Sequence, residues 1–252
     1  MNIVTTIKEW QDIRKKLSDQ QIGFVPTMGN LHAGHMSLYE RARKENDLTV
    51  ASIFLNPTQF NQSRDFELYP RTIEQDIELL SSHQVDFLFL PDSASMYPDQ
   101  FQVQVTETEL CQILEGEFRP GHFNGVLTVV LKLFNIIQPT RAYFGEKDYQ
   151  QLLLVKKMVS ALFLAIDVVA CPTVRAEDKL PLSSRNSRLT KEQREKAAHF
   201  SKLLASPISV EAIIHQLKEL GFKVDYVFDK WQRRLGAVWL DDVRLIDNIE
   251  RL

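Results

Sequence analysis

Apolar and polar positions change their period several times along the first 172 residues. Short apolar runs of the kind that form buried strands alternate with longer amphipathic segments of the kind that form helices. The runs that predict strands are 22–25, 49–55, 85–90, 102–105, 142–144 and 167–170. The segments that predict helices are 7–17, capped by Thr6, then 36–44, 73–83, 125–137 and 149–162.

This alternation predicts one parallel sheet with helices on both faces. Parallel neighbours cannot be joined by a tight turn, and the crossovers that join them usually contain a helix. The expected fold is therefore an α/β fold with a doubly wound parallel sheet, Rossmann-like in its arrangement.

The pattern changes after Pro172. A polar loop at 175–188 precedes two helical segments, 190–204 and 210–220, and three short strand-like pieces, 223–228, 237–240 and 244–246. We expect a boundary near Val174, with residues 1–173 forming the Rossmann-like domain. Residues 174–252 would then form a smaller α+β carboxyl-terminal domain that acts as a lid.

Composition and charge exclude several classes of protein. With 44% hydrophobic and 25% charged residues the chain is typical of soluble globular proteins. A net charge of −3 supplies no general basic field, so a small phosphate compound is favoured over nucleic acid. The apolar run 123–137 contains Lys132 and is shorter than the roughly 20 residues that a membrane helix needs. Charged residues replace the apolar core of a signal peptide near the start, and Cys111 and Cys171 have no framework spacing, so we expect a cytoplasmic protein.

The string "PTMGNLHAGH" at 26–35 concentrates glycine and histidine at the end of the first apolar run and the start of a helix. Ligands of open α/β sheets bind at the carboxyl ends of strands, and amides at a helix start bind anions. His32 and His35 would place two donors beside such an anion. Two alternatives stay open from the residues alone: the histidines cap or pack the turn, or they bind zinc, although no cysteine or carboxylate cluster accompanies them.

Two later strings add further phosphate donors. "YFGEKDYQQL" at 143–152 also leaves a strand for a helix and supplies Lys147 beside Asp148. "LSSRNSRL" at 182–189 offers two hydroxyls and Arg185 in a loop that could close over a nucleotide. Each string alone could also be a merely structural turn or polar loop. The phosphate loops with Gly-x-x-x-x-Gly-Lys or Gly-x-Gly-x-x-Gly spacing are absent.

The histidine turn and the Ser-Ser-Arg loop resemble the paired signatures of the adenylyl-transferring superfamily that includes class I aminoacyl-tRNA synthetases. Together with six further strings, the histidine turn and the Ser-Ser-Arg loop make the chain resemble the pantothenate synthetase family, also called pantoate:β-alanine ligases, over residues 22–190 and again at 244–248. Those strings are "SIFLNPTQF", "YPRT", "RPGHFNGVLTVVLKLFNIIQP", "YFGEKDYQQL", "PTVR" and "RLIDN".

The resemblance implies an ATP-dependent and Mg²⁺-dependent ligase that condenses pantoate with β-alanine through pantoyl adenylate. It implies His35, His32, Lys147 and Arg185 as catalytic residues, Gln59 and Gln151 as pantoate ligands, and Gln59 as the β-alanine ligand. Asp76 is the suggested metal ligand, Asn56, Arg119 and His122 are further contacts, and a homodimer is implied. The implied ATP-binding residues are Pro26, Met28, Gly29, Asn30, Leu31, His32, Ala33, Gly34, His35, Gly145, Glu146, Lys147, Asp148, Val174, Leu182, Ser183, Ser184 and Arg185.

The chain departs from the family pattern in three places. The loop "EDKLPLSSR" carries Lys179, Pro181 and Leu182 where the family has glycine, alanine and methionine, and the proline should stiffen it. The acidic run after "YPRT" is thinned, and the carboxyl-terminal domain is short. A nucleotidyltransferase that releases the adenylate is disfavoured by Gln59 and Gln151. A non-catalytic nucleotide-binding module is disfavoured because the histidines, the lysine and the arginine are all present.

Overall fold

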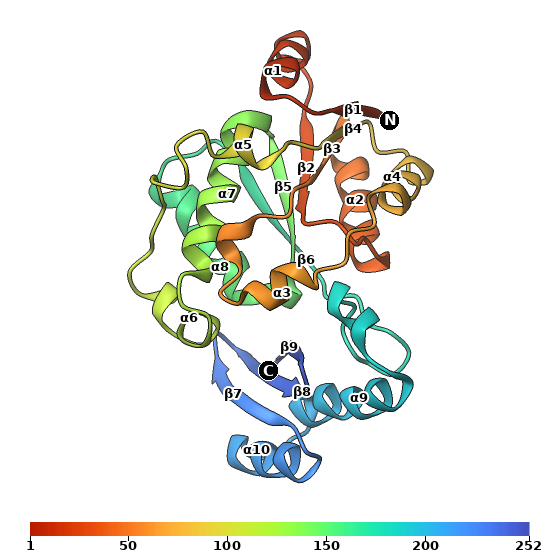
Figure 1. The fold of residues 1–252 in the computed structure, drawn as a ribbon, viewed down its shortest axis with the longest axis vertical. Helices are drawn as coiled ribbons and strands as arrows, with labels where there is room; N and C mark the ends of the chain where they lie inside the picture. Colours follow the sequence, from red (N-terminus) through yellow and green to blue (C-terminus); the bar gives the residue numbers. More distant parts are fainter. Residues whose placement is uncertain (252) are drawn as a thin grey trace. The chain divides into compact units, whose positions relative to one another are not determined.

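The computed structural model describes residues 1–251, and its contacts divide the chain into two compact units (Figure 1). The first unit comprises residues 1–145 and 150–171. The second comprises 146–149 and the chain from Pro172 onward. The short segment 146–149 therefore belongs to the second unit, although both of its neighbours in sequence belong to the first.

The first unit contains a six-stranded parallel sheet in the order β1-β4-β3-β2-β5-β6. This arrangement confirms the predicted doubly wound α/β fold. The order of the strands across the sheet changes direction at β2, which lies near the middle of the sheet. The segment after β2 therefore lies at a topological switch point. The strands are β1 (Asn2–Val4), β2 (Ile22–Thr27), β3 (Leu48–Ile53), β4 (Phe87–Phe89), β5 (Arg141–Gly145) and β6 (Asp167–Cys171).

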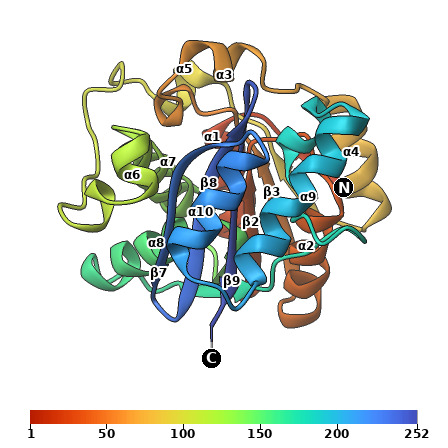
Figure 2. The same cartoon turned by 90° about the horizontal axis from the view of Figure 1, so that it is seen from below.

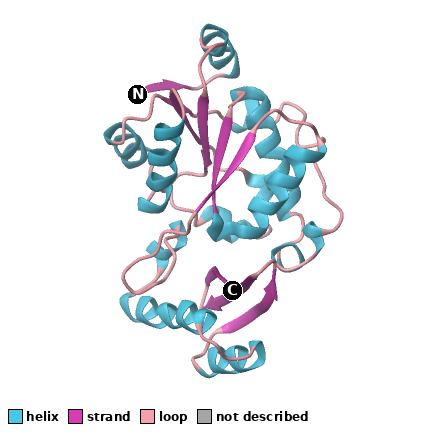
Figure 3. Cartoon of the chain, turned by 180° about the vertical axis from the view of Figure 1, so that it is seen from behind, coloured by secondary structure: helices cyan, strands magenta, loops and turns pink. Residues whose placement is uncertain are grey.

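Helices cover both faces of this sheet. In Figures 1 and 3, α2 (Ala33–Glu45) and α4 (Ile73–Ser82) lie on one side of the strands, and α7 (His122–Ile137) and α8 (Tyr149–Ala161) lie on the other. The remaining helix of ordinary length, α1 (Ile7–Lys16), begins at Thr6, whose hydroxyl accepts the Glu9 amide at 3.2 Å. The shorter helices are η1 (Pro57–Gln59), α3 (Ser63–Glu67), α5 (Ser93–Met96), η2 (Leu110–Gln112) and α6 (Glu115–Phe118).

The core beneath α2 and α4 explains why these segments fold as they do. Leu80 of α4 and Tyr39 of α2 pack against Val25, Ala51 and Leu88 of three neighbouring strands, and all five are at most 1% exposed. Removing such apolar surface from water is the main favourable contribution to folding. The packing thereby fixes where α2 begins relative to the end of β2.

The predicted strand at 102–105 is wrong. These residues have no regular secondary structure, Val103 is 65% exposed, and the Val105 amide donates to the hydroxyl of Thr128. A strand needs a neighbour for its hydrogen bonds. The edge beside β4 is already paired with β1, which the apolar pattern did not reveal because that strand is only three residues long.

The second unit contains an antiparallel sheet with two helices packed on one face (Figure 2). Thr190 and Gln193 form a capping box at the start of the first helix. Phe200 and Leu204 of that helix lie so close to Gly236 that a Cβ there would come within 3.0 Å of either side chain. The elements are η4 (Ser184–Arg188), α9 (Lys191–Ala205), α10 (Val210–Glu219), β7 (Lys223–Lys230), β8 (Arg233–Leu240) and β9 (Val243–Glu250).

Candidate functional site

The turn between β2 and α2 is held in a conformation that few residues adopt. Gly29 has φ of 83° and Asn30 has φ of 51°, both in the left-handed region. Asp76 of α4 stabilises this turn because its carboxylate accepts the Asn30 amide at 2.9 Å and the Leu31 amide at 2.7 Å. The hydroxyl of Thr72 donates to the same carboxylate at 3.2 Å, and Asp76 is only 3% exposed.

His32 and His35 lie side by side at the start of α2, with ring centroids 4.1 Å apart. Nδ1 of His32 accepts the Gly34 amide, and Nδ1 of His35 accepts the His32 amide, so each histidine caps the helix. An amide can only donate, so a neutral ring in either position carries its proton on Nε2. The histidines therefore cap the helix, which was one of the alternatives left open by the sequence. The same hydrogen bonds orient each ring so that Nε2 is its donor.

The side chain of Gln59 is fixed by Asn56 after the end of β3. Asn56 is fully buried, and its Nδ2 donates to the Gly125 carbonyl at 3.1 Å and to Oε1 of Gln59 at 3.2 Å. The Tyr97 hydroxyl donates to Oδ1 of Asn56 at 2.8 Å, and burial raises the pKa of this tyrosine, which favours the protonated donor. The Gln59 amide nitrogen lies against the sulfur of Met28. Gln59 therefore presents Nε2, its donor group, beside the β2–α2 turn.

His122 and Arg119 hold the backbone of the same residue. Nδ1 of His122 lies 2.8 Å from the Gln59 carbonyl, and Nη1 of Arg119 lies 3.0 Å from Nε2 of His122. A carbonyl accepts and a guanidinium donates, so His122 is a neutral imidazole protonated on Nδ1. Glu115 lies 3.6 Å from the guanidinium. Through this chain of contacts, the "RPGHF" string positions Gln59.

Two consecutive glutamines at the start of α8 differ in their surroundings. Gln150 is buried, donates to the carbonyls of Leu110 and Ile113, and accepts the Glu115 amide. It therefore holds the loop before α6. Gln151, the predicted pantoate ligand, is half-buried and belongs to the first unit, as do Gln59 and both histidines.

Lys147 lies in η3 (Glu146–Asp148), directly after β5 and within the second unit. Its ammonium is 3.7 Å from the Asp148 carboxylate, and the lysine side chain is 18% exposed. The carbonyls of Glu146 and Lys147 each accept a hydrogen bond from Asn248 of β9. Lys147, the predicted phosphate donor, therefore lies on a turn that is hydrogen-bonded to the antiparallel sheet.

The segment from Val174 to Arg185 forms a hairpin that leads into η4. Arg175 and Pro181 form a bridge, and the Leu182 amide donates to the Val174 carbonyl at 3.0 Å. Ser183 caps η4 by accepting the Arg185 amide at 3.3 Å. Ser184 is buried, so the two serines of the string have different surroundings.

No group of three or more histidine, cysteine, aspartate or glutamate side chains within residues 1–251 could hold a metal ion. Both oxygens of the Asp76 carboxylate accept hydrogen bonds in the β2–α2 turn. A zinc site at His32 and His35 has no third ligand of those types among the described residues. Mg²⁺ coordination by Asp76 stays a prediction.

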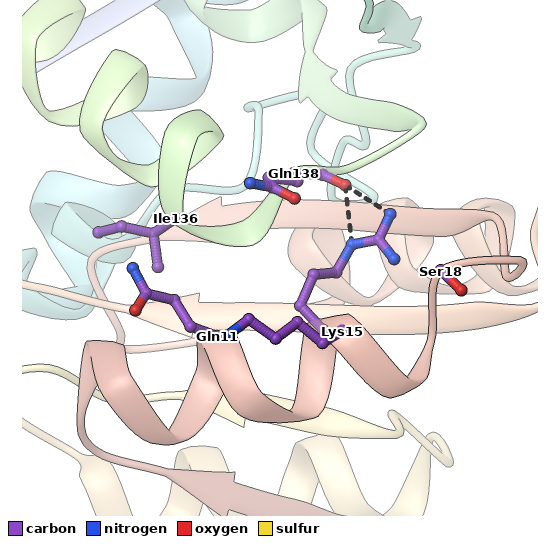
Figure 4. Close-up of a pocket in the computed structure, with 6 residues that line it drawn as sticks. Gln11, Lys15, Ser18, Ile136 and Gln138 are labelled. Atoms are coloured by element: carbon purple, nitrogen blue, oxygen red, sulfur yellow. Dashed lines mark hydrogen bonds between the residues drawn. The ribbon is translucent and has the colours of Figure 1, made fainter.

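A pocket of about 520 Å³ lies elsewhere, between α1 and the end of α7 (Figure 4). Gln11 and Lys15 line it from α1, and Ile136 and Gln138 from the opposite side. Arg14 donates from two nitrogens to the Gln138 carbonyl at 3.3 Å each, so its guanidinium caps the end of α7. The pocket lies before the starts of β2 and β5, at the amino ends of the strands, where ligands of such sheets rarely bind.

Three contributors to the site were not identified from the sequence. Tyr97 orients Asn56, and Arg233 and Asn248 hold the Lys147 turn. Asn248 lies in the "RLIDN" string, and this string was the available sequence signal for that residue. The string does not show which backbone groups its side chains contact.

Within the described residues no helix is long and apolar enough to cross a membrane. Cys111 and Cys171 are both free and buried. The candidate functional residues therefore lie in the histidine turn, in the pair Gln59 and Gln151, in the Lys147 turn and in the Val174–Arg185 segment.

Comparisons with known proteins show the family to which the chain belongs. The family model described as pantoate-beta-alanine ligase matches residues 2–250. A pantothenate synthetase of Legionella pneumophila (strain Philadelphia 1) is 52% identical over 249 residues, covering 98% of this chain and 99% of that protein. A pantothenate synthetase of Coxiella burnetii (strain RSA 493) is 50% identical over 247 residues, covering 98% of this chain and 96% of that protein.

Solved structures agree with the sequence comparisons. The pantoate-beta-alanine ligase of Francisella tularensis, solved in complex with beta-gamma ATP and beta-alanine, has a TM-score of 0.96 and 44% identity, covering 99% of this chain and 97% of that one. Pantothenate synthetase from Thermus thermophilus has a TM-score of 0.90 and 43% identity, covering 99% of both chains. The match extends over both units and all of the motifs above, so this chain belongs to the pantoate-beta-alanine ligase family.

Proposed function

We propose that this chain condenses pantoate with β-alanine to form pantothenate, using ATP and passing through pantoyl adenylate. The observation that carries the proposal is the β2–α2 turn, where two imidazoles are oriented by backbone amides at the carboxyl end of a central strand. Membership of the ligase family over residues 2–250 supports the same reaction. The Francisella tularensis relative was solved with beta-gamma ATP and beta-alanine, which supports both substrates here.

The first step needs charge neutralisation more than covalent chemistry. A carboxylate oxygen of pantoate attacks the α-phosphorus of ATP, and pyrophosphate leaves. Because nucleophile and phosphate are both anionic, catalysis depends on alignment and on donors aimed at the charge that develops on phosphate oxygens. The Nε2 donors of His32 and His35, the Lys147 ammonium and the Arg185 guanidinium would stabilise that developing negative charge, together with the amides at the start of α2.

The proposed ATP ligands come from four segments of the chain. The end of β2 and the start of α2, with the turn between them, contribute half of them, residues 145–148 contribute four including the lysine, and the hairpin and η4 contribute the other five. They are Pro26, Met28, Gly29, Asn30, Leu31, His32, Ala33, Gly34, His35, Gly145, Glu146, Lys147, Asp148, Val174, Leu182, Ser183, Ser184 and Arg185.

Gln59 and Gln151 are the proposed pantoate ligands, and Gln59 also contacts β-alanine. A neutral carboxamide can donate to substrate oxygens without neutralising the carboxylate that must attack. The contact from Asn56 to Oε1 leaves Nε2 of Gln59 as the group that donates. In the second step the amine of β-alanine attacks the acyl carbon, loses a proton, and AMP leaves.

Mg²⁺ is proposed as the metal that accompanies ATP. Within the described residues there is no cage of three or more acidic, histidine or cysteine side chains, and this fits an ion held largely by the substrate's phosphates. Asp76 is the proposed protein ligand, directly or through water. When bound, the ion would offset negative charge on the triphosphate.

The remaining proposals concern the setting of the enzyme. We infer a cytoplasmic homodimer that binds neither nucleic acid nor membrane. The net charge of −3 supports the absence of nucleic acid binding. The dimer rests on resemblance to the family.

The experiment that tests the function is an assay of AMP release by the purified protein with ATP, Mg²⁺, pantoate and β-alanine. Omitting the acid or the amine, one at a time, should abolish AMP release. AMP release that persists without β-alanine would indicate another acceptor, and AMP release that requires an acid other than pantoate would overturn the substrate assignment.

A further inference from the structure

Asn248 of β9 holds the turn that carries Lys147. Its side-chain nitrogen donates to the Glu146 carbonyl and to the Lys147 carbonyl, both at 2.9 Å, and the residue is only 3% exposed. One buried amide thus satisfies two consecutive backbone acceptors. A buried carbonyl without a donor is costly, so these bonds specify the conformation of the turn.

Arg233 determines which way the Asn248 amide faces. Its Nη1 donates to Oδ1 of Asn248 at 2.9 Å, so the amide nitrogen must point toward the turn. The other Nη of Arg233 donates to the Glu146 carboxylate at 2.9 Å, and the guanidinium lies 4.3 Å from the centre of the Tyr149 ring. Asn248 and Arg233 therefore hold residues 146–149 through contacts to Glu146, Lys147 and Tyr149.

The neighbouring residue of β9 holds a second segment. Asp247 has a fully buried carboxylate that pairs with both Nη groups of Arg175 at 2.8 Å. Arg175 also donates to the carbonyls of Lys179 and Asn248. The hairpin that leads into the Ser183–Arg185 loop is therefore tied to the strand position next to the one that holds the Lys147 turn.

We propose that Asn248 is a positioning residue for ATP binding, because it fixes the backbone from which the Lys147 ammonium extends. The inference rests on the proposed function and deepens it. Lysine is a point charge on a flexible stem, so the precision of its placement depends on its backbone. Adjacent residues of β9 thereby keep two phosphate-binding segments in a fixed register with each other.

The test is a double-mutant cycle on the full-length protein, with Asn248→Ala, Lys147→Ala and the double variant. Affinity for Mg·ATP is measured by calorimetry. Asn248→Ala should weaken binding at least about 10-fold, since small misplacements of a charged contact are costly. In the Lys147→Ala background the same change should alter affinity by less than about 2-fold, because the group that Asn248 positions is gone.

Controls separate positioning from general stability. Asp225 of β7 accepts bonds from Trp239 and Arg244 and its side chain is 8% exposed, so Asp225→Asn perturbs the same sheet without touching the Lys147 turn. It should lower the unfolding temperature and leave ATP affinity within about 2-fold of wild type. Asn248→Asp keeps the size of the side chain but faces two carbonyls with a carboxylate, so it should weaken ATP binding at least as much as Asn248→Ala.

Wild-type affinity in the folded Asn248 variants, or an equal loss with and without Lys147, would overturn the inference. Failure of both Asn248 variants to fold would also overturn it in favour of a purely structural role. ATP binding does not depend on the identity of the acid. A wild-type protein that binds ATP but makes no pantothenate would therefore refute the proposed function while leaving this inference intact.

Discussion

Asp76 illustrates how one buried carboxylate can determine the shape of a ligand-binding turn. It accepts two consecutive backbone amides, those of Asn30 and Leu31, from a turn with two left-handed residues. The sequence suggested Asp76 only as a metal ligand, because spacing cannot show that residues 46 positions apart meet. Its hydrogen bonds give Asp76 a second role, which is to hold the β2–α2 turn. This role does not depend on a metal ion.

We expect Asp76→Asn to destabilise the protein and to weaken ATP binding even when Mg²⁺ is removed by a chelator. The side-chain NH₂ of the new asparagine would face a backbone N–H of the turn at a position where the carboxylate now accepts, so two donors would meet. A buried N–H group without an acceptor costs about 1–3 kcal/mol. Thermal unfolding and calorimetric titration with ATP, each in a chelator, measure the two effects.

Glu74→Gln is the matched control, since Glu74 is exposed on the same helix and should tolerate the change. If Asp76→Asn bound metal-free ATP like wild type and differed only in its Mg²⁺ requirement, the turn-holding role would be refuted and metal coordination favoured.

Gln59→Ala should weaken pantoate binding by about 1–3 kcal/mol, roughly 5-fold to 150-fold, and change ATP binding little. Its Nε2 faces away from Asn56 and is proposed to donate to the acid and not to ATP. Separate calorimetric titrations with pantoate and with ATP check the difference. Gln75→Ala, at an exposed position, serves as the control. Equal losses for the two ligands would contradict the assignment.

At the level of elements, the sequence predicted most helices and the central strands because their boundaries carry local signals. Thr6 caps α1 as expected, Thr190 caps α9 at the predicted start of that helix, and the apolar run that ends at Val25 is the central strand β2. The failures, 102–105 and β1, both concern the sheet edge. Which segment pairs there is decided by competition between distant pieces of chain, and periodicity does not encode that outcome.

Gly125 shows where two elements approach too closely for any side chain. A Cβ on this residue of α7 would lie 2.4 Å from the Thr58 carbonyl in η1. In an unconstrained helix, alanine in place of glycine would stabilise by about 1 kcal/mol. Here the added methyl must displace the backbone that carries Gln59.

Gly125→Ala is therefore expected to destabilise the protein by about 1–3 kcal/mol, the range typical of overpacking, and to weaken pantoate binding. Denaturant unfolding and pantoate titration measure the two effects. Asn124→Ala, one position earlier in α7, is the control for helix propensity. A Gly125→Ala variant that is more stable than wild type would show that the close approach does not constrain η1.

For the whole molecule, the sequence indicated a change of pattern near Val174 but not the membership of residues 146–149 in the second unit. That segment sits between β5 and α8 in the chain, and its partner Asn248 is about 100 positions away. Sequence order therefore groups Lys147 with the parallel sheet, while its contacts group it with β9. Long-range side-chain contacts of this kind leave no periodic signal.

The protein is expected to be a homodimer, on the basis of its resemblance to the family. Light scattering coupled to size exclusion should give twice the chain mass of 29.2 kDa at micromolar concentration. A mass of one chain under those conditions would count against the dimer.

The proposed function requires that an acyl adenylate form before the amine reacts. Exchange of labelled pyrophosphate into ATP, with Mg²⁺ and pantoate but no β-alanine, would detect that separate step. We expect exchange that requires pantoate and falls by about 100-fold or more in His35→Ala, because the loss of one oriented donor to a transferring phosphate costs several kcal/mol. Exchange that occurs only when β-alanine is present would contradict a separate adenylate step.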